Sequence, residues 1–335
     1  MTDLSTTYLG LHLRSPLVAS ANPLTGDVDS LRSLEAAGAA AVVLPSLFEE
    51  QLTQESVEIH EMLETAAWSN PEAMSYFPEL DDYNTGPGRY LRLIEEAKAK
   101  LDIPVIASLN GATRGGWTYY SRLMEDAGAD AIELNVYRIA ADVSESPRRV
   151  EEEYCDLVAS VRDAIDVPLA VKVGPFFTAF ANLARRLVDA GADGLVMFNR
   201  FYQPDLNTET REVESHLVLS TSDELRLVLR WLAIIDGRIA ASKAATTGVH
   251  TVNDVVKALM VGADVTMLAS ALLRNGPAHL TMLEEGLALW LEEHEYDAVE
   301  QLKGCASQRF VDDPSAFERA NYMRILTSYS SPFLV

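Results

Sequence analysis

Cysteine is scarce in this 335-residue sequence, which contains only Cys155 and Cys305 and no Cys-x-x-Cys motif. This spacing disfavours a disulfide framework, a cysteine-ligated zinc site and an iron–sulfur cluster. The six histidines are scattered and form no His-Glu-x-x-His motif, so we expect no catalytic metal. A Gly-x-Ser-x-Gly motif is also missing, which leaves nucleophilic serine hydrolysis without support.

Basic residues are outnumbered, because 27 Lys and Arg stand against 50 Asp and Glu, for a formal net charge of −23. Such a charge repels phosphate backbones and anionic membranes, so we expect neither nucleic acid nor a membrane as partner. The N-terminal segment MTDLSTTYLG resembles no leader peptide, and no uncharged apolar run of about 18 residues occurs. We therefore expect a cytoplasmic protein that acts on small molecules.

One pattern occurs four times along the chain: an amphipathic helix, a glycine, and a short apolar strand. It is found in LEAAGAAAVVL (34–44), MEDAGADAIEL (124–134), LVDAGADGLVM (187–197) and LMVGADVTML (259–268). A glycine suits the left-handed position that ends a helix. The strands show no clean polar alternation, which is typical of a parallel sheet buried on both faces.

Four more strands follow a Pro or Gly, at 15–21, 103–110, 167–173 and 237–242. Helical patterns separate the strands at 28–31, 88–100, 116–127, 150–164, 179–190, 223–235, 252–261 and 278–292. Eight βα units predict an α/β fold, a single (β/α)8 TIM barrel over about 15–292. The whole chain, 1–335, is then one domain with a C-terminal extension at 293–335. An open doubly wound sheet is the alternative, but its Gly-x-Gly-x-x-Gly turn is missing.

Three connections are long for such a fold, at 46–86, 137–148 and 200–221. All three follow the carboxyl end of a predicted strand, which is the face where barrel enzymes keep their active sites. The first includes an aromatic-rich segment at 66–90 and is either a lid or a subunit contact.

The segment ATTGVHTVND (245–254) follows the seventh predicted strand. The loops after strands seven and eight of such barrels commonly bind phosphate through backbone N–H groups. Thr246, Thr247 and Gly248 supply hydroxyls and a closely approachable backbone, and Ala269 and Ser270 follow the eighth strand. An ordinary capped turn is the alternative, but together with eight βα units the segment predicts a phosphate site.

Lys172 lies near the end of the fifth strand among apolar neighbours, where a charge needs a partner or an anionic ligand. Glu133, in the buried-looking strand AIELNV, is a candidate partner. Three asparagines end strands three, four and six: Asn110, Asn135 and Asn199. Convergent amides at strand ends suit a planar molecule with paired donors and acceptors.

Several of these segments resemble the dihydroorotate dehydrogenase family, in particular its soluble class 1 branch, over essentially the whole barrel. The matching segments are SPLVASANP, IELN, PLAVKVGPFF and GADGLVMFNRF. The resemblance implies an FMN flavoprotein that oxidises dihydroorotate, or a related CH–CH substrate, by hydride transfer to flavin N5 in pyrimidine biosynthesis. It also implies a homodimer.

Carried over residue by residue, the resemblance places Lys172 beside the flavin N1 and C2 carbonyl, where it stabilises the anionic reduced flavin. Asn110 contacts the isoalloxazine, and Asn135 and Asn199 bind the substrate or the flavin edge. The complete implied FMN set is Ala19, Ser20, Ser46, Asn110, Asn135, Lys172, Asn199, Thr247, Gly248, Ala269 and Ser270.

The family's base motif N-L-S-C-P-N reads NVYRIA at 135–140, so that Arg138 stands where the family carries its catalytic Cys. Arginine stays protonated and cannot serve as an ordinary general base. Tyr137, Ser144 and Ser146 are candidate replacements. The catalytic base is therefore unknown from the sequence, and the substrate need not be dihydroorotate itself.

Arg200 follows Asn199 where the family usually carries Ser. Arg138 and Arg200 are predicted on neighbouring strand ends, where two guanidinium groups can bind a carboxylate. We therefore expect an anionic substrate, bound by Asn135, Asn199, Arg138 and Arg200.

Two other functions stay open. The altered NVYRIA loop fits a flavin-binding redox partner of another protein, without dihydroorotate activity. A phosphate-binding barrel that is a lyase or isomerase, with Lys172 forming a Schiff base, is the other. The sequence leaves open whether the electron acceptor is fumarate, a nicotinamide, a quinone or ferredoxin.

Overall fold

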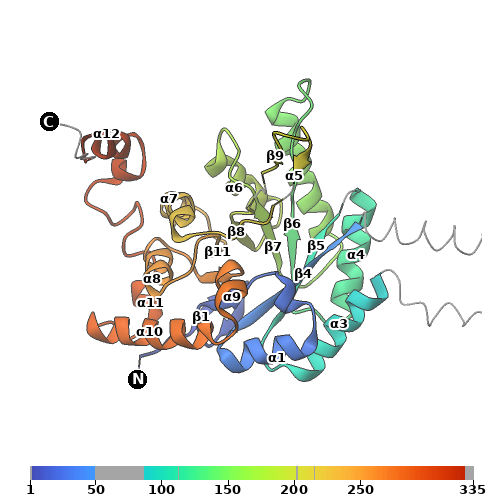
Figure 1. The fold of residues 1–335 in the computed structure, drawn as a ribbon, viewed down its shortest axis with the longest axis horizontal. Helices are drawn as coiled ribbons and strands as arrows, with labels where there is room; N and C mark the ends of the chain where they lie inside the picture. Colours follow the sequence, from blue (N-terminus) through green and yellow to red (C-terminus); the bar gives the residue numbers. More distant parts are fainter. Residues whose placement is uncertain (1, 50–86, 112, 201–202, 215, 329–335) are drawn as a thin grey trace, which may run out of the picture.

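The computed structural model describes residues 2–49, 87–111, 113–200, 203–214 and 216–328. Its centre is a closed barrel of eight parallel strands, which confirms the predicted (β/α)8 fold (Figure 1). In barrel order the strands are β3 (Leu17–Ala19), β4 (Ala41–Phe48), β5 (Val105–Asn110), β6 (Ala131–Asn135), β7 (Leu169–Val173), β8 (Gly194–Met197), β11 (Ser242–Thr246) and β12 (Val265–Leu268).

Helices connect successive strands and surround the barrel (Figure 1). They are α1 (Val28–Ala37), α3 (Pro87–Lys100), α4 (Arg114–Asp126), α5 (Pro147–Arg162), α6 (Phe180–Asp189), α7 (Leu225–Ile235), α8 (Val252–Met260), α9 (Ser270–Asn275) and α10 (His279–Glu293). α1 is longer than the predicted 28–31: Asp27 caps its N-terminus, and Gly38, at φ +119°, ends it. No described helix has both the length and the apolarity needed to cross a bilayer.

The seventh strand was predicted wrongly, because 237–242 is not its position. α7 ends at Ile235, Gly237 turns the chain at φ +65°, and the strand begins only at Ser242. The apolar Ile239 packs in the outer core and not in the barrel wall. The strand itself, SKAAT, has a lysine and small residues, so its hydrophobic signal is weak.

The long connections also differ from their predicted limits. Residues 46–48 belong to β4, so the first connection starts later than 46. Its remainder at 50–86, with most of the aromatic segment at 66–90, lies outside the described residues, and 87–90 begin α3. The connection at 200–221 contains a small hairpin of β9 (Asp205–Leu206) and β10 (Val213–Glu214), followed by η4 (Ser222–Glu224).

An N-terminal hairpin of β1 (Thr6–Tyr8) and β2 (Leu11–Leu13) closes the amino end of the barrel. Tyr8, Leu9 and Leu13 are buried in one cluster with the inward-facing side chains of the strands. Gly194 makes room for the hairpin, because a Cβ there would lie 2.5 Å from Leu9 Cδ2. The barrel interior is therefore a packed core below its carboxyl end.

After α10 the chain forms α11 (Val299–Leu302), η5 (Pro314–Phe317) and α12 (Arg319–Ser328). Figure 1 shows α12 set apart from the barrel near the C-terminus. The last residues of the predicted C-terminal extension, 329–335, lie outside the described residues.

Candidate active site

A cavity of about 510 Å³ opens at the carboxyl end of the barrel strands. Residues from seven of the eight strand ends, or from the turns after them, line it: Ser20, Ala21, Asn22, Pro23, Pro45, Ser46, Phe48, Asn135, Lys172, Phe198, Asn199, Arg200, Thr246, Thr247, Gly248, Val249, Met267, Ala269 and Ser270, with Ser220 from the long connection. Most of the residues predicted for the flavin site are therefore brought together. We call this space the central cavity.

Lys172 forms the floor of the central cavity and is only 8% exposed. Its Nζ lies 3.3 Å from Oε1 of Glu133, which is fully buried one strand away. The predicted partnership of these two residues is therefore observed. Burying a charge costs free energy, and the cost is much larger when the charge has no partner. Lys172 and Glu133 therefore each need the opposite charge of the other to be buried here.

A chain of polar side chains crosses the strand ends at one wall. Asn199 Nδ2 donates to Asn135 Oδ1 at 2.5 Å, and Asn135 Nδ2 donates to Ser46 Oγ at 3.1 Å. Ser46 Oγ lies 2.8 Å from Ser108 Oγ. The network fixes how both amides are presented to the cavity, because rotating either amide breaks a hydrogen bond.

The turn after β11 lines the part of the central cavity that lies next to Phe198. Thr247 and Gly248 both have positive φ, +71° and +85°. Thr247 Oγ1 donates to the Phe198 carbonyl at 3.1 Å, and a Cβ on Gly248 would lie 2.4 Å from the Leu225 backbone N. Gly248 has no side chain, so its backbone lines the cavity. Backbone turns of this kind are common phosphate-binding walls in barrels.

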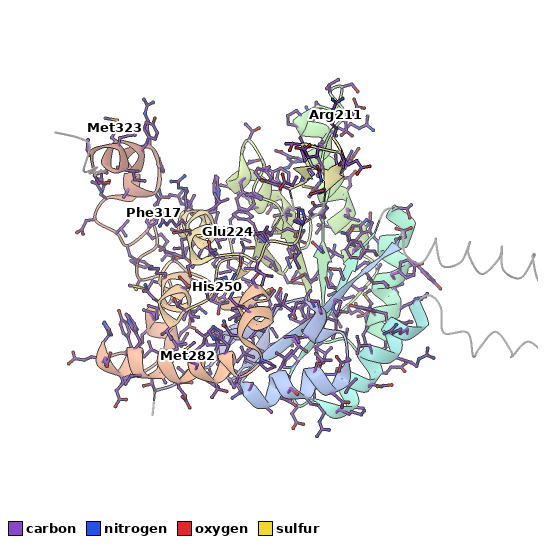
Figure 2. The ribbon with its side chains drawn as sticks, in the orientation of Figure 1. Arg211, Glu224, His250, Met282, Phe317 and Met323 are labelled. Carbon is purple, nitrogen blue, oxygen red and sulfur yellow. The ribbon has the colours of Figure 1, made fainter. Side chains whose placement is uncertain are left out.

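Two polar residues near this turn were not predicted from the sequence: Ser220, which lines the central cavity, and His250, which contacts it. Ser220 Oγ lies 3.0 Å from His250 Nε2, and the Ser220 N–H donates to Ser270 Oγ at 3.2 Å. Burial, and then the Arg274 charge, lower the pKa of His250. The signal in the sequence was the position of His250, directly after Gly248 and Val249; Figure 2 labels its side chain.

A second cavity of about 780 Å³ adjoins the central cavity and shares Phe198, Asn199, Arg200 and Thr247 with it. Arg200 therefore lies on the boundary between the two. Its Nε lies 2.9 Å from Oε2 of Glu224, which is labelled in Figure 2, and it also donates to the Val218 carbonyl.

The resemblance implied that Asn110 lines the flavin site together with Lys172, but Asn110 is not among the residues that line the central cavity. It lines a third cavity of about 680 Å³, together with Gly111 and Trp117. Phe48, its register partner on β4, lines the central cavity instead. Gly111 lets the Trp117 ring pack against this turn, since a Cβ there would lie 2.8 Å from the indole. Ala19 is fully buried directly before the cavity residue Ser20.

Arg138 and Tyr137 also line the third cavity. Arg138 is bound by two carboxylates, Glu145 and Glu153, and its hydrogen bond to Glu153 raises its pKa further. It therefore cannot act as a base, and its guanidinium is already engaged. The structure does not bring Arg138 and Arg200 into one carboxylate site, because they line different cavities.

The two serine candidates for the base have structural contacts. Ser144 Oγ donates to Asp142 Oδ1 at 2.7 Å, and Ser146 caps the N-terminus of α5. Neither serine is among the residues that line the central cavity. Within the described ranges, no group of three His, Cys, Asp or Glu side chains is arranged to hold a metal ion.

The profile of a protein family described as "Dihydroorotate dehydrogenase" matches residues 83–291. The catalytic subunit of dihydroorotate dehydrogenase B (NAD(+)) from Thermoplasma volcanium is 25% identical over 322 residues, 92% of this chain and 100% of that protein. NAD-dependent dihydropyrimidine dehydrogenase subunit PreA from Escherichia coli strain K12 is 22% identical over 331 residues, 92% of this chain and 78% of PreA. A putative dihydroorotate dehydrogenase A (fumarate) from Aeropyrum pernix is 26% identical over 219 residues, 62% of this chain and 70% of that protein.

Proposed function

Because this chain belongs to the dihydroorotate dehydrogenase family, we propose that it is an FMN-dependent oxidoreductase acting on a CH–CH bond of dihydroorotate or a related anionic small molecule. The observation that carries the proposal is the central cavity, which gathers Lys172, the two amides of Asn135 and Asn199, and the turn at Thr247 and Gly248. The family resemblance of the sequence motifs is confirmed by the profile match.

The central cavity fits FMN in size and chemistry. Its volume of about 510 Å³ lies within the range of roughly 300–1,000 Å³ that is usual for small-molecule sites. Pro45, Phe48, Val249 and Met267 give it apolar walls for a planar ring system. A bound flavin would supply the two-electron acceptor that the protein's own side chains lack.

Two parts of the central cavity have different tasks in this proposal: the turn after β11 and the floor at Lys172. The backbone at Thr247 and Gly248, with Ser270 beside it, would hold the phosphate through N–H groups and hydroxyls. Lys172 would place its charge at the floor, where a negative charge on the ring edge is stabilised by a preorganised cation. Glu133 keeps that cation in place.

The substrate would lie against Asn135 and Asn199, whose amides are held by one hydrogen-bonded network. Arg200, at the boundary of the two adjoining cavities, would contact an anionic group of the substrate in exchange for part of its contact with Glu224. Arg138 takes no part, since it is bound to Glu145 and Glu153 in another cavity.

The visible spectrum of the purified protein tests both halves of the proposal. We expect the absorption bands of oxidised flavin, and bleaching of those bands when dihydroorotate is added under nitrogen. If the bands persist with dihydroorotate but bleach with another dihydropyrimidine, the substrate is that related compound and not dihydroorotate. A colourless protein that binds no added FMN would contradict the proposal.

The second candidate is a flavin-binding redox partner of another protein. Apolar side chains at the rim of the second cavity favour it: Phe176 and Val218 line that cavity and are 73% and 64% exposed. Large exposed apolar groups of this kind occur at protein interfaces. A flavoprotein that ignores all dihydropyrimidines but co-purifies with a second redox subunit would establish this function in place of the first.

A further inference from the structure

The Tyr8 side chain enters the barrel from the amino end and is fully buried. Around it the strands present small inward residues, Ala131, Ala170 and Ala244 among them. Ala131 is two residues before Glu133 on β6, and Ala170 is the register partner of Glu133 on β7. Because side chains alternate along a strand, Ala131 and Glu133 face the same interior, so the Glu133 carboxylate points into the space that Tyr8 enters from the amino end.

Two buried polar atoms in this interior have no hydrogen-bond partner among the described residues: the Tyr8 hydroxyl and Glu133 Oε2. The other oxygen of Glu133 pairs with Lys172 at 3.3 Å. Buried polar groups are almost always satisfied, by protein or by ordered water, because an unmade hydrogen bond costs the full desolvation of the group. Both atoms therefore call for a partner.

Burial, followed by the charges of Glu133 and Asp264, raises the pKa of Tyr8 well above its usual range. The hydroxyl is therefore a donor, and it lies within electrostatic reach of both carboxylates. Asp264 is already satisfied, because Oδ1 lies 2.7 Å from Lys303 Nζ and Oδ2 accepts the Lys243 N–H at 2.7 Å. Glu133 Oε2 is the acceptor that remains.

We propose that one ordered water inside the barrel accepts a hydrogen bond from the Tyr8 hydroxyl and donates one to Glu133 Oε2. Glu133 is then held on both oxygens, by Lys172 and by the water. Tyr8 and Glu133 thereby become positioning residues for Lys172 at the floor of the central cavity. The water and its contacts are independent of any cofactor, whereas their effect on a flavin rests on the proposed function.

The Tyr8→Phe substitution tests the water bridge, because it removes only the hydroxyl. We expect it to lower the folding equilibrium constant, measured by urea unfolding, about tenfold. In the Lys172→Met/Glu133→Leu background, which replaces the ion pair by apolar groups, the same substitution should cost nothing. If Tyr8→Phe leaves the folding equilibrium constant of the natural sequence unchanged or raises it, the hydroxyl has no hydrogen-bond partner and the proposal is wrong. An equal loss in both backgrounds would show a partner other than Glu133.

Ser121→Ala is the matched control, since Ser121 Oγ is also buried and has no hydrogen-bond partner within the described part of the chain, but lies on α4, outside the barrel. Its effect should be the same in both backgrounds. If Lys172→Met/Glu133→Leu does not fold, a high-resolution crystal structure of the natural protein decides. A water oxygen within about 3 Å of both atoms supports the proposal, and a Tyr8 hydroxyl bonded to any other acceptor overturns it.

The positioning role has its own measurement, the reduction potential of the bound flavin. Without the Tyr8 hydroxyl, the water loses the donor that holds it against Glu133, and the carboxylate charge at the cavity floor is less well compensated. Tyr8→Phe should therefore lower the potential, while Ser121→Ala leaves it unchanged; an equal potential in both variants would overturn the positioning role. A protein that binds no flavin would contradict the proposed function and would still allow the unfolding test.

Discussion

Lys172 forms the charged floor of the central cavity, and its ammonium group is paired with the buried carboxylate of Glu133. Lys172→Met leaves a fully buried carboxylate without its cation, so we predict a loss of about 3–5 kcal/mol in the free energy of unfolding. The paired variant Lys172→Met/Glu133→Leu should recover most of that loss, because an apolar pair of similar size needs no desolvated charge. Urea titrations of the three proteins give the comparison, and equal losses in both variants would refute it.

Protonation of His250 is expected to lower the free energy of unfolding as the pH falls. Its pKa in the folded protein is lowered from 6.5 by burial and by Arg274, so the unfolded chain binds the proton more tightly. The stabilisation is present above about pH 6.5 and is lost as the pH falls through the lower, folded pKa. His250→Gln keeps a polar side chain at this position and should flatten the pH dependence of the unfolding free energy between about pH 5 and 7, the range in which an ordinary histidine titrates.

At the scale of elements, the turn between β11 and α8 is held by its contact with the start of α7. Gly248 is at φ +85°, and an added Cβ would lie 2.4 Å from the Leu225 backbone. Gly248→Ala therefore combines an unfavourable conformation with a steric overlap against backbone atoms. Gly276→Ala is the matched control, because Gly276 is at φ +78° with no atom within 4 Å of the added Cβ.

We predict that Gly276→Ala costs about 1–3 kcal/mol, the conformational part alone, and that Gly248→Ala costs clearly more. Thermal or urea unfolding of both variants measures the difference. The Gly248 variant should in addition bind FMN more weakly, since the turn must shift away from Leu225. If both variants lose the same unfolding free energy, the start of α7 can shift away from the added Cβ at no measurable cost.

Elements that form from local signals were predicted well. Glycines such as Gly38, Gly128 and Gly191 end helices with positive φ, and apolar runs follow each of them, so the repeating βα units are readable from short segments. β11 was misplaced because its interior positions are Ala and Thr, whose hydrophobic signal is weak. The N-terminal hairpin depends on contacts between residues far apart in the sequence, for example the hydrogen bond that the Leu9 N–H donates to Ser242 Oγ. A local sequence pattern cannot predict such contacts.

For the whole molecule, the barrel explains which site residues could be predicted. Lys172, Asn135, Asn199 and the turn at 247–248 meet because parallel strands end at one face. Arg138 lies beyond a strand end, where Glu153 on α5 and Glu145 just before α5 bind its guanidinium and so set its direction. The homodimer and the partner redox protein stay predictions, since they concern contacts beyond a single chain.

Cofactor preference is the most direct test of the central claim that this barrel end binds FMN. Protein freed of flavin is titrated with FMN and, as the matched control, with riboflavin, which has the same ring system without the phosphate. We predict that FMN binds at least tenfold more tightly, because in the proposed site Thr247, Gly248 and Ser270 would hold its phosphate. Equal affinity for the two compounds, or no binding of either, would contradict it.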